Sequence, residues 1–322
     1  MSAFPQLGQH PAASHLIVHL SDTHFLAEQQ RLYGTVNTDS TLERALQQIE
    51  HSGLRPDALV ITGDVADRGE PDAYRRVRAL VQTAAAGWGS AVIWVMGNHD
   101  DRTAFRGALL DEDAIGEDAI GDEAMREGAT SNGDPTAPVD AVTTVNGLRI
   151  ITLDTSVPGY HHGDLSPDQL DWLAAELTQP AAHGTVLALH HPPLPTPVGL
   201  LSILELREQH RLAAVLAGSD VRIVLAGHLH TATHGLCAGI PVSVAAATSY
   251  SIDLTAPVRE LHGVNGGQAL HLVHVYADQV THSQVPIGDF DTVSRLDAAL
   301  LTRLERLGPA EREAAFSRQP TA

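Results

Sequence analysis

The sequence contains a single cysteine, Cys237, and few aromatic side chains. One cysteine excludes an internal disulfide bond and a zinc site built from several thiolates, so His, Asp and Asn remain as the side chains available to bind a metal ion. Phe, Trp and Tyr make up only 4% of the 322 residues. Because Val, Leu and Ala supply most of the apolar residues, we expect an aliphatic core in which Cys237 is one small buried residue.

Long apolar runs are also missing. No stretch approaches the roughly 20 consecutive apolar residues that a membrane-spanning helix requires. Residues 1–15 lack the charged-then-apolar order of a signal peptide. We therefore expect a cytoplasmic protein without a transmembrane segment.

Basic residues are scarce: 20 Lys and Arg stand against 39 Asp and Glu, for a formal net charge of −19. This balance argues against nucleic acid as a partner, because no basic surface replaces the counterions of the phosphate backbone. A small anionic substrate is still compatible if bound metal ions supply positive charge locally. Nine acidic residues and only one basic residue lie between Asp111 and Asp134. We interpret residues 111–134 as a mobile acidic surface insertion, with an interaction tail as the alternative.

Apolar, β-branched runs alternate with helical patterns for most of the chain, which is typical of a layered α/β fold. The predicted strands are 16–20, 58–62, 91–96, 149–153, 185–189, 221–225, 240–246 and 269–276, and the predicted helices are 40–51, 71–86, 167–178 and 204–217. Ser166, Pro167 and Gln169 form a capping box at the start of one helix. We expect an N-terminal extension at 1–14, one domain at 15–285 and a C-terminal helical tail at 286–322.

The tail contains Leu296, Leu300, Leu304 and Leu307 on one face of a final helix. Packing on the body or on a partner subunit is one interpretation. A peripheral membrane contact is a weaker one, because the polar face mixes acidic and basic residues instead of being mainly basic.

Five short motifs follow five of the predicted strands. They are Asp22-Thr23-His24, Gly63-Asp64, Gly97-Asn98-His99-Asp100, His190-His191-Pro192 and Gly227-His228-Leu229-His230. Ligands bind at the carboxyl ends of strands in open α/β sheets, so we expect these scattered residues to converge. We expect Asp22 and His24 to leave one side of an extended backbone, and Gly63 and Gly97 to provide sharp turns. One such motif alone is usually structural, but the five in this order predict a metal site.

The five motifs resemble those of the calcineurin-like metallophosphoesterase superfamily over roughly residues 16–285. The longer strings HLSDTH, ITGDVADRGEPDAY, WVMGNHDDR and LAGHLH resemble bacterial class III cyclic-nucleotide phosphodiesterases. The resemblance implies a four-layer α-β-β-α sandwich, two mixed β-sheets flanked by helices, and two metal ions, often iron with manganese or zinc. It implies that Asp22, His24 and His230 hold the first ion, that Asn98, His190 and His228 hold the second, and that Asp64 bridges them. A homodimer is implied by the resemblance alone.

The ligand types also fit this chemistry without the family. Neutral imidazoles with few carboxylates leave the metal pair positively charged, so that it binds a phosphate oxygen and still lowers the pKa of a bridging water. The resulting hydroxide attacks phosphorus. Histidine ligands suit iron, zinc or manganese better than calcium or magnesium. We predict that His99 protonates the leaving oxygen or stabilises charge on the phosphoryl group, and that Asp100 orients it. The alternative for His99 is a hydrogen bond to a metal ligand.

The resemblance, together with these ligand types, predicts an enzyme that hydrolyses cyclic nucleotides, in the first place 3′,5′-cyclic AMP to 5′-AMP. One alternative is a broad-specificity phosphodiesterase acting on 2′,3′-cyclic nucleotides or glycerophosphodiesters. The alternative of another class is a non-catalytic scaffold with the same fold, which the complete ligand set disfavours. His161 and His162, with Tyr160, are candidates for the substrate mouth or for an ordinary solvated turn. Asp67 and Arg68 either brace the loop after Asp64 or form a surface ion pair.

Overall fold

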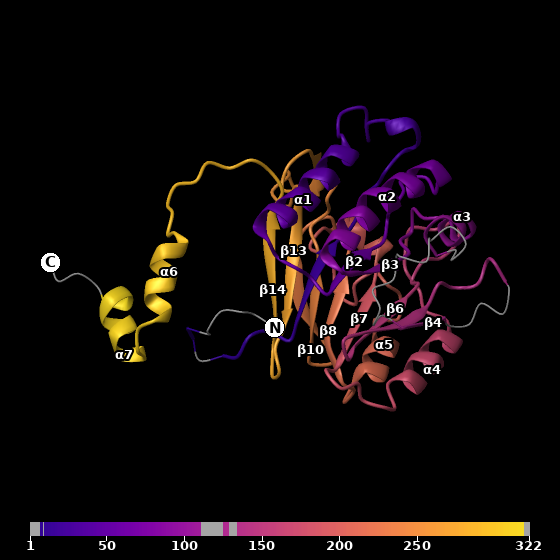
Figure 1. Ribbon diagram of the computed structural model, residues 1–322. Coiled ribbons are helices and arrows are strands. Elements are labelled where there is room, and N and C mark those ends of the chain that lie inside the picture. The colour runs from indigo at the N-terminus through magenta and orange to yellow at the C-terminus, as the bar shows by residue number, and fades with distance from the viewer. Residues whose placement is uncertain (1–6, 9, 111–124, 129–133, 319–322) are drawn as a thin grey trace. The chain divides into compact units, whose positions relative to one another are not determined.

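The computed structural model describes residues 7–8, 10–110, 125–128 and 134–318 (Figure 1). The described residues fall into two compact units. One is Ser14–Ile287, and the other combines residues before 14 with residues after 287. Most of the acidic segment 111–134 lies outside the described residues, so its role as a mobile insertion stays a prediction. The domain limits at 1–14, 15–285 and 286–322 likewise stay predictions.

The strands of the large unit form two extensive sheets. The first has the order β14-β13-β1-β2-β3, with β1, β2 and β3 parallel to one another and β13 antiparallel to both of its neighbours. Its strands are β1 (His15–Leu20), β2 (Ala58–Thr62), β3 (Ala91–Val95), β13 (Ala269–Val275) and β14 (Val280–Pro286).

The second sheet has the order β4-β5-β6-β7-β8-β10-β9, in which β6, β7, β8 and β10 run parallel. Its strands are β4 (Met125–Gly128), β5 (Ala141–Val145), β6 (Leu148–Leu153), β7 (Thr185–Leu189), β8 (Val221–Ala226), β9 (Thr233–Cys237) and β10 (Ile240–Val244). A short antiparallel pair consists of β11 (Ser251–Ile252) and β12 (Gly263–Val264).

Helices cover the outer face of each sheet. They are α1 (Thr38–Ser52), α2 (Pro71–Trp88), α3 (Arg102–Phe105), α4 (Pro167–Glu176) and α5 (Gln209–Leu216). The helix α2 shows how the sequence produces such a covering helix. Pro71 occupies its first turn, and Gly89 ends it in the left-handed conformation. Its buried residues recur every three or four positions, so one face packs on the sheet. At α4, the predicted capping box of Ser166 and Gln169 is present.

Three apolar cores hold these layers together. One joins α1 and α2 to the first sheet, through residues such as Leu42, Val77 and Ile61. A second joins α4 and α5 to the second sheet. The third lies between the sheets and includes Ile17 from one sheet and Ile223 from the other. The predicted α-β-β-α sandwich is therefore confirmed.

The eight predicted strands are all present, but several elements were missed or misplaced. The strands β9 and β14 escaped prediction because both carry polar residues in alternation at a sheet edge. The predicted helix 204–217 was wrong at its start: α5 begins at Gln209, after Glu208 adopts a φ of 48°. Residues 206–207 pair instead with the backbone of Gly163.

In the small unit, α6 (Ala298–Glu305) begins after Leu296, which therefore precedes the helix, and α7 (Pro309–Arg312) follows. Asp297 caps α6 by accepting a hydrogen bond from the Leu300 amide, and Leu304 is buried. None of the helices in the described part of the chain is both long and apolar enough to cross a membrane.

Candidate metal centre

The five motifs lie at the carboxyl ends of parallel strands. In the first sheet Asp22 follows β1, Asp64 follows β2 and Asn98 follows β3; in the second sheet His190 follows β7 and His228 follows β8. Because the strands within each sheet are parallel there, each set of loops leaves its sheet at a single edge. The His228 amide donates a hydrogen bond to the Asp22 carboxylate at 3.1 Å, which joins the two edges.

The backbone at these motifs corrects one of our expectations. We expected an extended D-x-H segment, but φ is 53° at Asp22 and 45° at His24; at His228 and His230 it is 70° and 56°. Such left-handed conformations cost roughly 1–3 kcal/mol each for residues with a Cβ atom, and they concentrate at functional sites. These turns bring Asp22 and His24 into one group of ligand atoms, whereas His228 and His230 belong to two different groups.

Two glycines make this packing feasible for different reasons. Gly63 has a φ of 90°, which is the sharp turn that we predicted. Gly97 is required by space instead of by φ: a Cβ atom there would lie 2.2 Å from both the Asp64 amide nitrogen and its Oδ1. The loops after β2 and β3 can therefore touch only if residue 97 lacks a side chain.

The first group of candidate ligands consists of Asp22, His24, Asp64 and His230, all buried, with one ligand atom from each lying within 4.8 Å of the others. The Nε2 atoms of His24 and His230 are 3.2 Å apart. His230 Nε2 lies 3.4 Å from Asp22 Oδ1, and His24 Nε2 lies 3.6 Å from Asp64 Oδ2. Two imidazoles and two carboxylates facing one space are a suitable donor set for a transition-metal ion.

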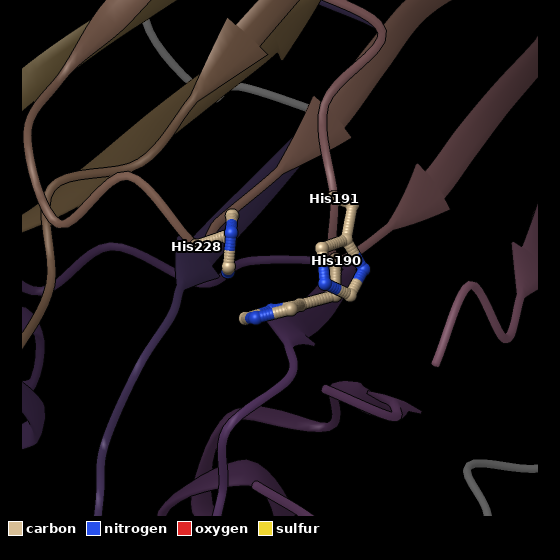
Figure 2. A group of neighbouring side chains, drawn as sticks. All are labelled: His190, His191 and His228. Atoms are coloured by element: carbon tan, nitrogen blue, oxygen red, sulfur yellow. The ribbon is translucent and has the colours of Figure 1, made fainter. Parts of the chain in front are cut away.

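The second group adjoins the first through Asp64. His190 Nε2 lies 3.3 Å from the same Asp64 Oδ2 atom, and the His190 and His228 ring centroids are 5.1 Å apart. Figure 2 shows these rings beside His191, where the loops leave the strands. Asp64 Oδ2 thus faces His24 on one side and His190 on the other.

His191 is near the second group but differs from His190 in its hydrogen bonds. A ring nitrogen of each residue lies within 4.8 Å of one from His228. However, His191 Nε2 donates to His161 O at 3.1 Å, and His191 Nδ1 accepts from Thr155 Oγ1 at 2.8 Å. Both of its nitrogens are engaged, so we favour His190 as the ligand.

The four candidate histidine ligands are held in one tautomer by their surroundings. Each donates one ring N–H to an oxygen atom, which leaves a lone pair on the other nitrogen. The bonds are His24 Nδ1 to Asp67 Oδ1 (3.0 Å), His190 Nδ1 to Thr62 O (2.6 Å), His228 Nε2 to Leu204 O (3.1 Å) and His230 Nδ1 to Tyr250 O (2.9 Å). Thr62, Leu204 and Tyr250 carry no sequence signal for this role, because they act through backbone carbonyls.

Burial and the neighbouring charges act differently on the candidate ligands. Burial acts to lower the pKa of His190 and of His24, but Asp64 raises that of His190 to about 9, and Asp67 and Asp64 raise that of His24, so an ion that binds His190 displaces a proton. Burial lowers the pKa of His228 to about 3 and that of His230 to about 4, so both rings are neutral at pH 7. For Asp64, burial acts to raise the pKa, but His190, His99 and His24 hold it well below its usual value. Asp64 is therefore a carboxylate, whose Oδ1 accepts the His99 amide and whose Oδ2 lies near His24 and His190.

Unsatisfied buried atoms provide a test of whether metal ions fit here. Among the described residues, His190 Nε2 and Asn98 Oδ1 are buried without a hydrogen-bond partner. Such atoms cost roughly 1–3 kcal/mol each when nothing binds them. Both are the atoms through which these side chains would coordinate an ion, so the donor set fits a pair of metal ions.

His99 lies beside the first group, where its ring centroid is 4.8 Å from that of His24. Its Nδ1 donates to Asp67 O at 2.8 Å, and its backbone amide donates to Asp64 Oδ1 at 2.9 Å. Asp67 therefore holds both His24 and His99, which goes beyond the predicted bracing of a loop. Its neighbour Arg68 is exposed and 3.7 Å from the Asp67 carboxylate.

The prediction that Asp100 orients His99 is corrected by the geometry. The Asp100 carboxylate accepts backbone N–H groups of Val65, Ala66 and Gly97, as well as the Tyr74 hydroxyl. Burial and the nearby Asp64 raise its pKa to about 6. Asp100 thus holds the loop after β2 against the loop after β3, and the partner of the His99 ring is Asp67.

The structure separates the two candidate substrate residues. His161 is exposed at the centre: its Nδ1 lies 2.9 Å from Asn98 Nδ2, and its ring centroid is 5.1 Å from that of His99. His162 is buried and packs against Tyr160. Asn98, His99 and residues 156–159 line a cavity of about 250 Å³ next to the centre. His161 thus lies at the candidate centre, whereas His162 is buried away from it; a substrate role for His161 stays a prediction.

The loop that carries His161 depends on a buried carboxylate network that the sequence did not reveal. Asp154 accepts the Arg102 guanidinium at 2.8 Å and the amides of Val139 and Ser156. Asp140 Oδ1 in turn accepts the Asp154 amide at 2.8 Å. Burial and the nearby Asp154 raise the pKa of Asp140 to about 7.

We expect Asp140→Asn to remove part of the pH dependence of folding. In the folded state Asp140 keeps its proton up to about pH 7, but in the unfolded chain it loses it near pH 4, so stability falls as the pH rises from 4 to 7. A shift of about three pKa units corresponds to at most on the order of 4 kcal/mol. Denaturation measured at pH 5 and pH 8 should show that the free energy of unfolding falls less between these pH values in the variant than in the wild type. Equal decreases would contradict this prediction.

Comparisons with known proteins agree with this geometry. A family model described as calcineurin-like phosphoesterase matches residues 15–232. A Mycobacterium tuberculosis protein named as a cAMP/cGMP dual specificity phosphodiesterase is 49% identical over 285 residues, which cover 88% of this chain and 83% of that protein. A Rhodococcus erythropolis protein named "Probable cyclic nucleotide phosphodiesterase" is 50% identical over 285 residues, which cover 88% of this chain and 88% of that protein.

The fold is shared with solved structures at low sequence identity. A dimetal phosphatase from Danio rerio aligns with a TM-score of 0.55 and 16% identity, over 86% of this chain and 98% of its own. The family match spans most of the chain and includes all five motifs. The chain therefore belongs to the calcineurin-like phosphoesterase family and is a hydrolase of phosphodiester bonds, as its motifs predicted.

Proposed function

We propose that this enzyme hydrolyses 3′,5′-cyclic nucleotides, with cyclic AMP as its main substrate and 5′-AMP as the product. The observation that carries the proposal is the position of Asp64 Oδ2, within 3.6 Å of His24 Nε2 and 3.3 Å of His190 Nε2, between two groups of ligand atoms. The names of the relatives at 49% and 50% identity support a cyclic nucleotide as the substrate class.

We assign the ligands as the resemblance implied, and the two groups of ligand atoms support this assignment. Asp22, His24 and His230 would hold one ion, Asn98, His190 and His228 would hold the other, and Asp64 would be shared by both. The imidazole-rich donor set favours iron with manganese or zinc. When bound, such a pair supplies Lewis acidity toward phosphate oxygens and an activated water as the nucleophile.

The remaining side chains act on the phosphodiester itself. As the water oxygen bonds to phosphorus and the bond from phosphorus to O3′ breaks, O3′ needs a proton. We assign this transfer to Nε2 of His99, because Nδ1 is held by the Asp67 carbonyl. His161 and the Asn98 amide, 2.9 Å apart, border the space for a phosphoryl oxygen. Asp67 is a positioning residue, since it acts through His24 and His99.

The charge of the site suits a small anion on an acidic protein. The chain carries a formal charge of −19, yet four imidazoles and one amide contribute no negative charge to the ligand set. Two divalent or trivalent ions would leave this set positive, which confines anion binding to the site. A homodimer and a cytoplasmic location are further parts of the proposal, and they do not affect the chemistry.

The proposal is tested by comparing substrates on metal-stripped protein that has been reloaded with manganese. We expect 3′,5′-cyclic AMP to be turned over with a higher kcat/KM than 2′,3′-cyclic AMP, a glycerophosphodiester or bis(4-nitrophenyl) phosphate. Higher kcat/KM for any of the other diesters would make cyclic AMP incidental and favour a broad-specificity enzyme. Absence of metal-dependent turnover with all four would favour the scaffold hypothesis.

A further inference from the structure

Four histidines outside the five motifs come together between the two sheets. His19 lies on β1, His271 on β13 and His282 on β14, all in the first sheet, while His234 lies on β9 in the second. The ring of His282 is central: its centroid lies 4.6 Å from that of His271, 5.4 Å from His234 and 5.8 Å from His19. Figure 1 shows β13 and β14 next to each other at one side of the first sheet.

Strand alternation explains why these rings meet. Side chains two residues apart share a face of a strand, so His19 shares a face with Ile17, and His271 with Val273, both of which belong to the core between the sheets. His282 pairs with Val273 across β13 and β14, and cross-strand partners lie on the same face. In the second sheet, His234 on β9 pairs with Ser243 on β10. Its Nδ1 atom forms a hydrogen bond with the Ser243 hydroxyl at 2.9 Å.

The cluster contains ring nitrogens that nothing in the described structure satisfies. His19 and His271 are fully buried, yet the Nδ1 atom of each lacks a hydrogen-bond partner, as do both ring nitrogens of His282. The same condition marks His190 Nε2 in the metal centre. Unsatisfied buried nitrogens cost roughly 1–3 kcal/mol each, so several on neighbouring rings indicate a missing ligand.

We propose that His19, His234 and His282 form a separate, mononuclear site for a divalent transition-metal ion such as Zn²⁺. Two imidazoles on one tetrahedral ion place their ring centroids about 5 Å apart, given bond lengths near 2 Å. The separations of His282 from His234 and His19, 5.4 and 5.8 Å, are close to this value. The ring nitrogens of the three residues do not all lie within 4.8 Å of one another, so the rings of His234 and His282 have to rotate to meet one ion. Imidazole donors without carboxylates select zinc, nickel or copper over calcium and magnesium.

The partners of each ring determine its role. His19 Nε2 lies 2.8 Å from Thr62 Oγ1, which leaves Nδ1 as the nitrogen available to an ion. His282 is half-buried and His234 is exposed, so these two can rotate to complete the site and admit the ion from the edge. Zinc sites with three protein ligands keep a fourth position for water.

His271 is a hydrogen-bond donor to this site instead of a fourth ligand. Its Nε2 accepts the Ala246 amide at 2.9 Å, so the proton of the neutral ring resides on Nδ1. Burial lowers the pKa of His271 to about 4, which keeps the ring neutral. The unpartnered Nδ1–H group suits an oxygen ligand on the ion.

The test is a zinc titration of holoenzyme whose catalytic centre is already loaded, with zinc content measured after gel filtration. We expect one additional zinc ion per chain in the wild type and a rise of roughly 5 °C in the melting temperature. His282→Gln and His234→Gln should each lose this ion and the thermal shift, while their turnover stays within about twofold of the wild type. Both residues border solvent, so the variants should fold.

His274→Gln is the matched control, because His274 is a half-buried histidine on β13 whose ring stacks on Tyr276, outside the cluster. It should bind zinc as the wild type does. The proposal is overturned if the wild type takes up no additional ion, if His282→Gln takes up as much as the wild type, or if the control loses as much zinc as the cluster variants. Stacked neutral histidines with buried water would explain those results.

Discussion

Asn98→Ala and His190→Ala should each reduce the tightly bound metal from two ions per chain to one and lower turnover of cyclic AMP by about a thousandfold. Each substitution removes an atom that is buried without another partner and that we assign to the second ion. Metal ions contribute several kcal/mol to stabilising charge in such transition states, and each 1.36 kcal/mol corresponds to a tenfold change in rate. Elemental analysis and kcat on the same samples measure both effects.

The matched control is His191→Asn, which changes the adjacent and equally buried histidine. Because both His191 nitrogens are engaged with Thr155 and His161, this variant should retain two ions. Some loss of turnover is expected, since the loop that carries His161 is less well held. If His191→Asn lost an ion while His190→Ala kept two, the assignment of these two residues would be reversed.

His99→Ala should lower kcat for cyclic AMP by roughly a hundredfold to a thousandfold and leave the metal content unchanged. Proton transfer by a positioned side chain contributes about 10²–10⁴ to such reactions. The leaving alkoxide of a cyclic nucleotide needs that proton, whereas a 4-nitrophenolate does not. The loss should therefore be much smaller with bis(4-nitrophenyl) phosphate as the substrate.

This contrast between substrates separates two roles for His99. A ring nitrogen of His99 lies within 4.8 Å of ligand atoms from His24 and Asp67, so a metal-holding role is the main alternative. In that case His99→Ala would lose metal and would slow both substrates alike. His161→Ala serves as a comparison, because it removes a neighbour of Asn98. It should raise KM, and its effect should not depend on the leaving group of the substrate.

Much of the site could be predicted from the sequence, because the motifs that form it directly follow predicted strands. Five motifs after five apolar runs suffice to predict convergence, since parallel strands present their carboxyl ends at one edge. The superfamily resemblance then supplied the sorting of His228 and His230 into separate groups. Spacing alone had suggested an extended backbone, which the left-handed conformations of Asp22 and His24 contradict.

The rest of the site depends on contacts between residues distant in the chain. Asp67 holds both His24 and His99, whereas Asp100 accepts backbone amides of the loop after β2. In the sequence both are carboxylates a few residues from a predicted ligand, and nothing in their neighbouring residues tells these two roles apart. Backbone carbonyls such as Thr62 O leave no sequence signal at all. The edge strands β9 and β14 were missed for a similar reason, because polar alternation at an edge does not differ from a loop.

The most direct test of the account is turnover of 3′,5′-cyclic AMP as a function of metal added to stripped protein. We predict no turnover without metal and full activity only when two ions are bound per chain, with the Asn98→Ala and His190→Ala variants saturating at one ion and remaining slow. Full activity at one ion per chain, or turnover that persists after complete removal of metal, would contradict a dinuclear centre built around Asp64.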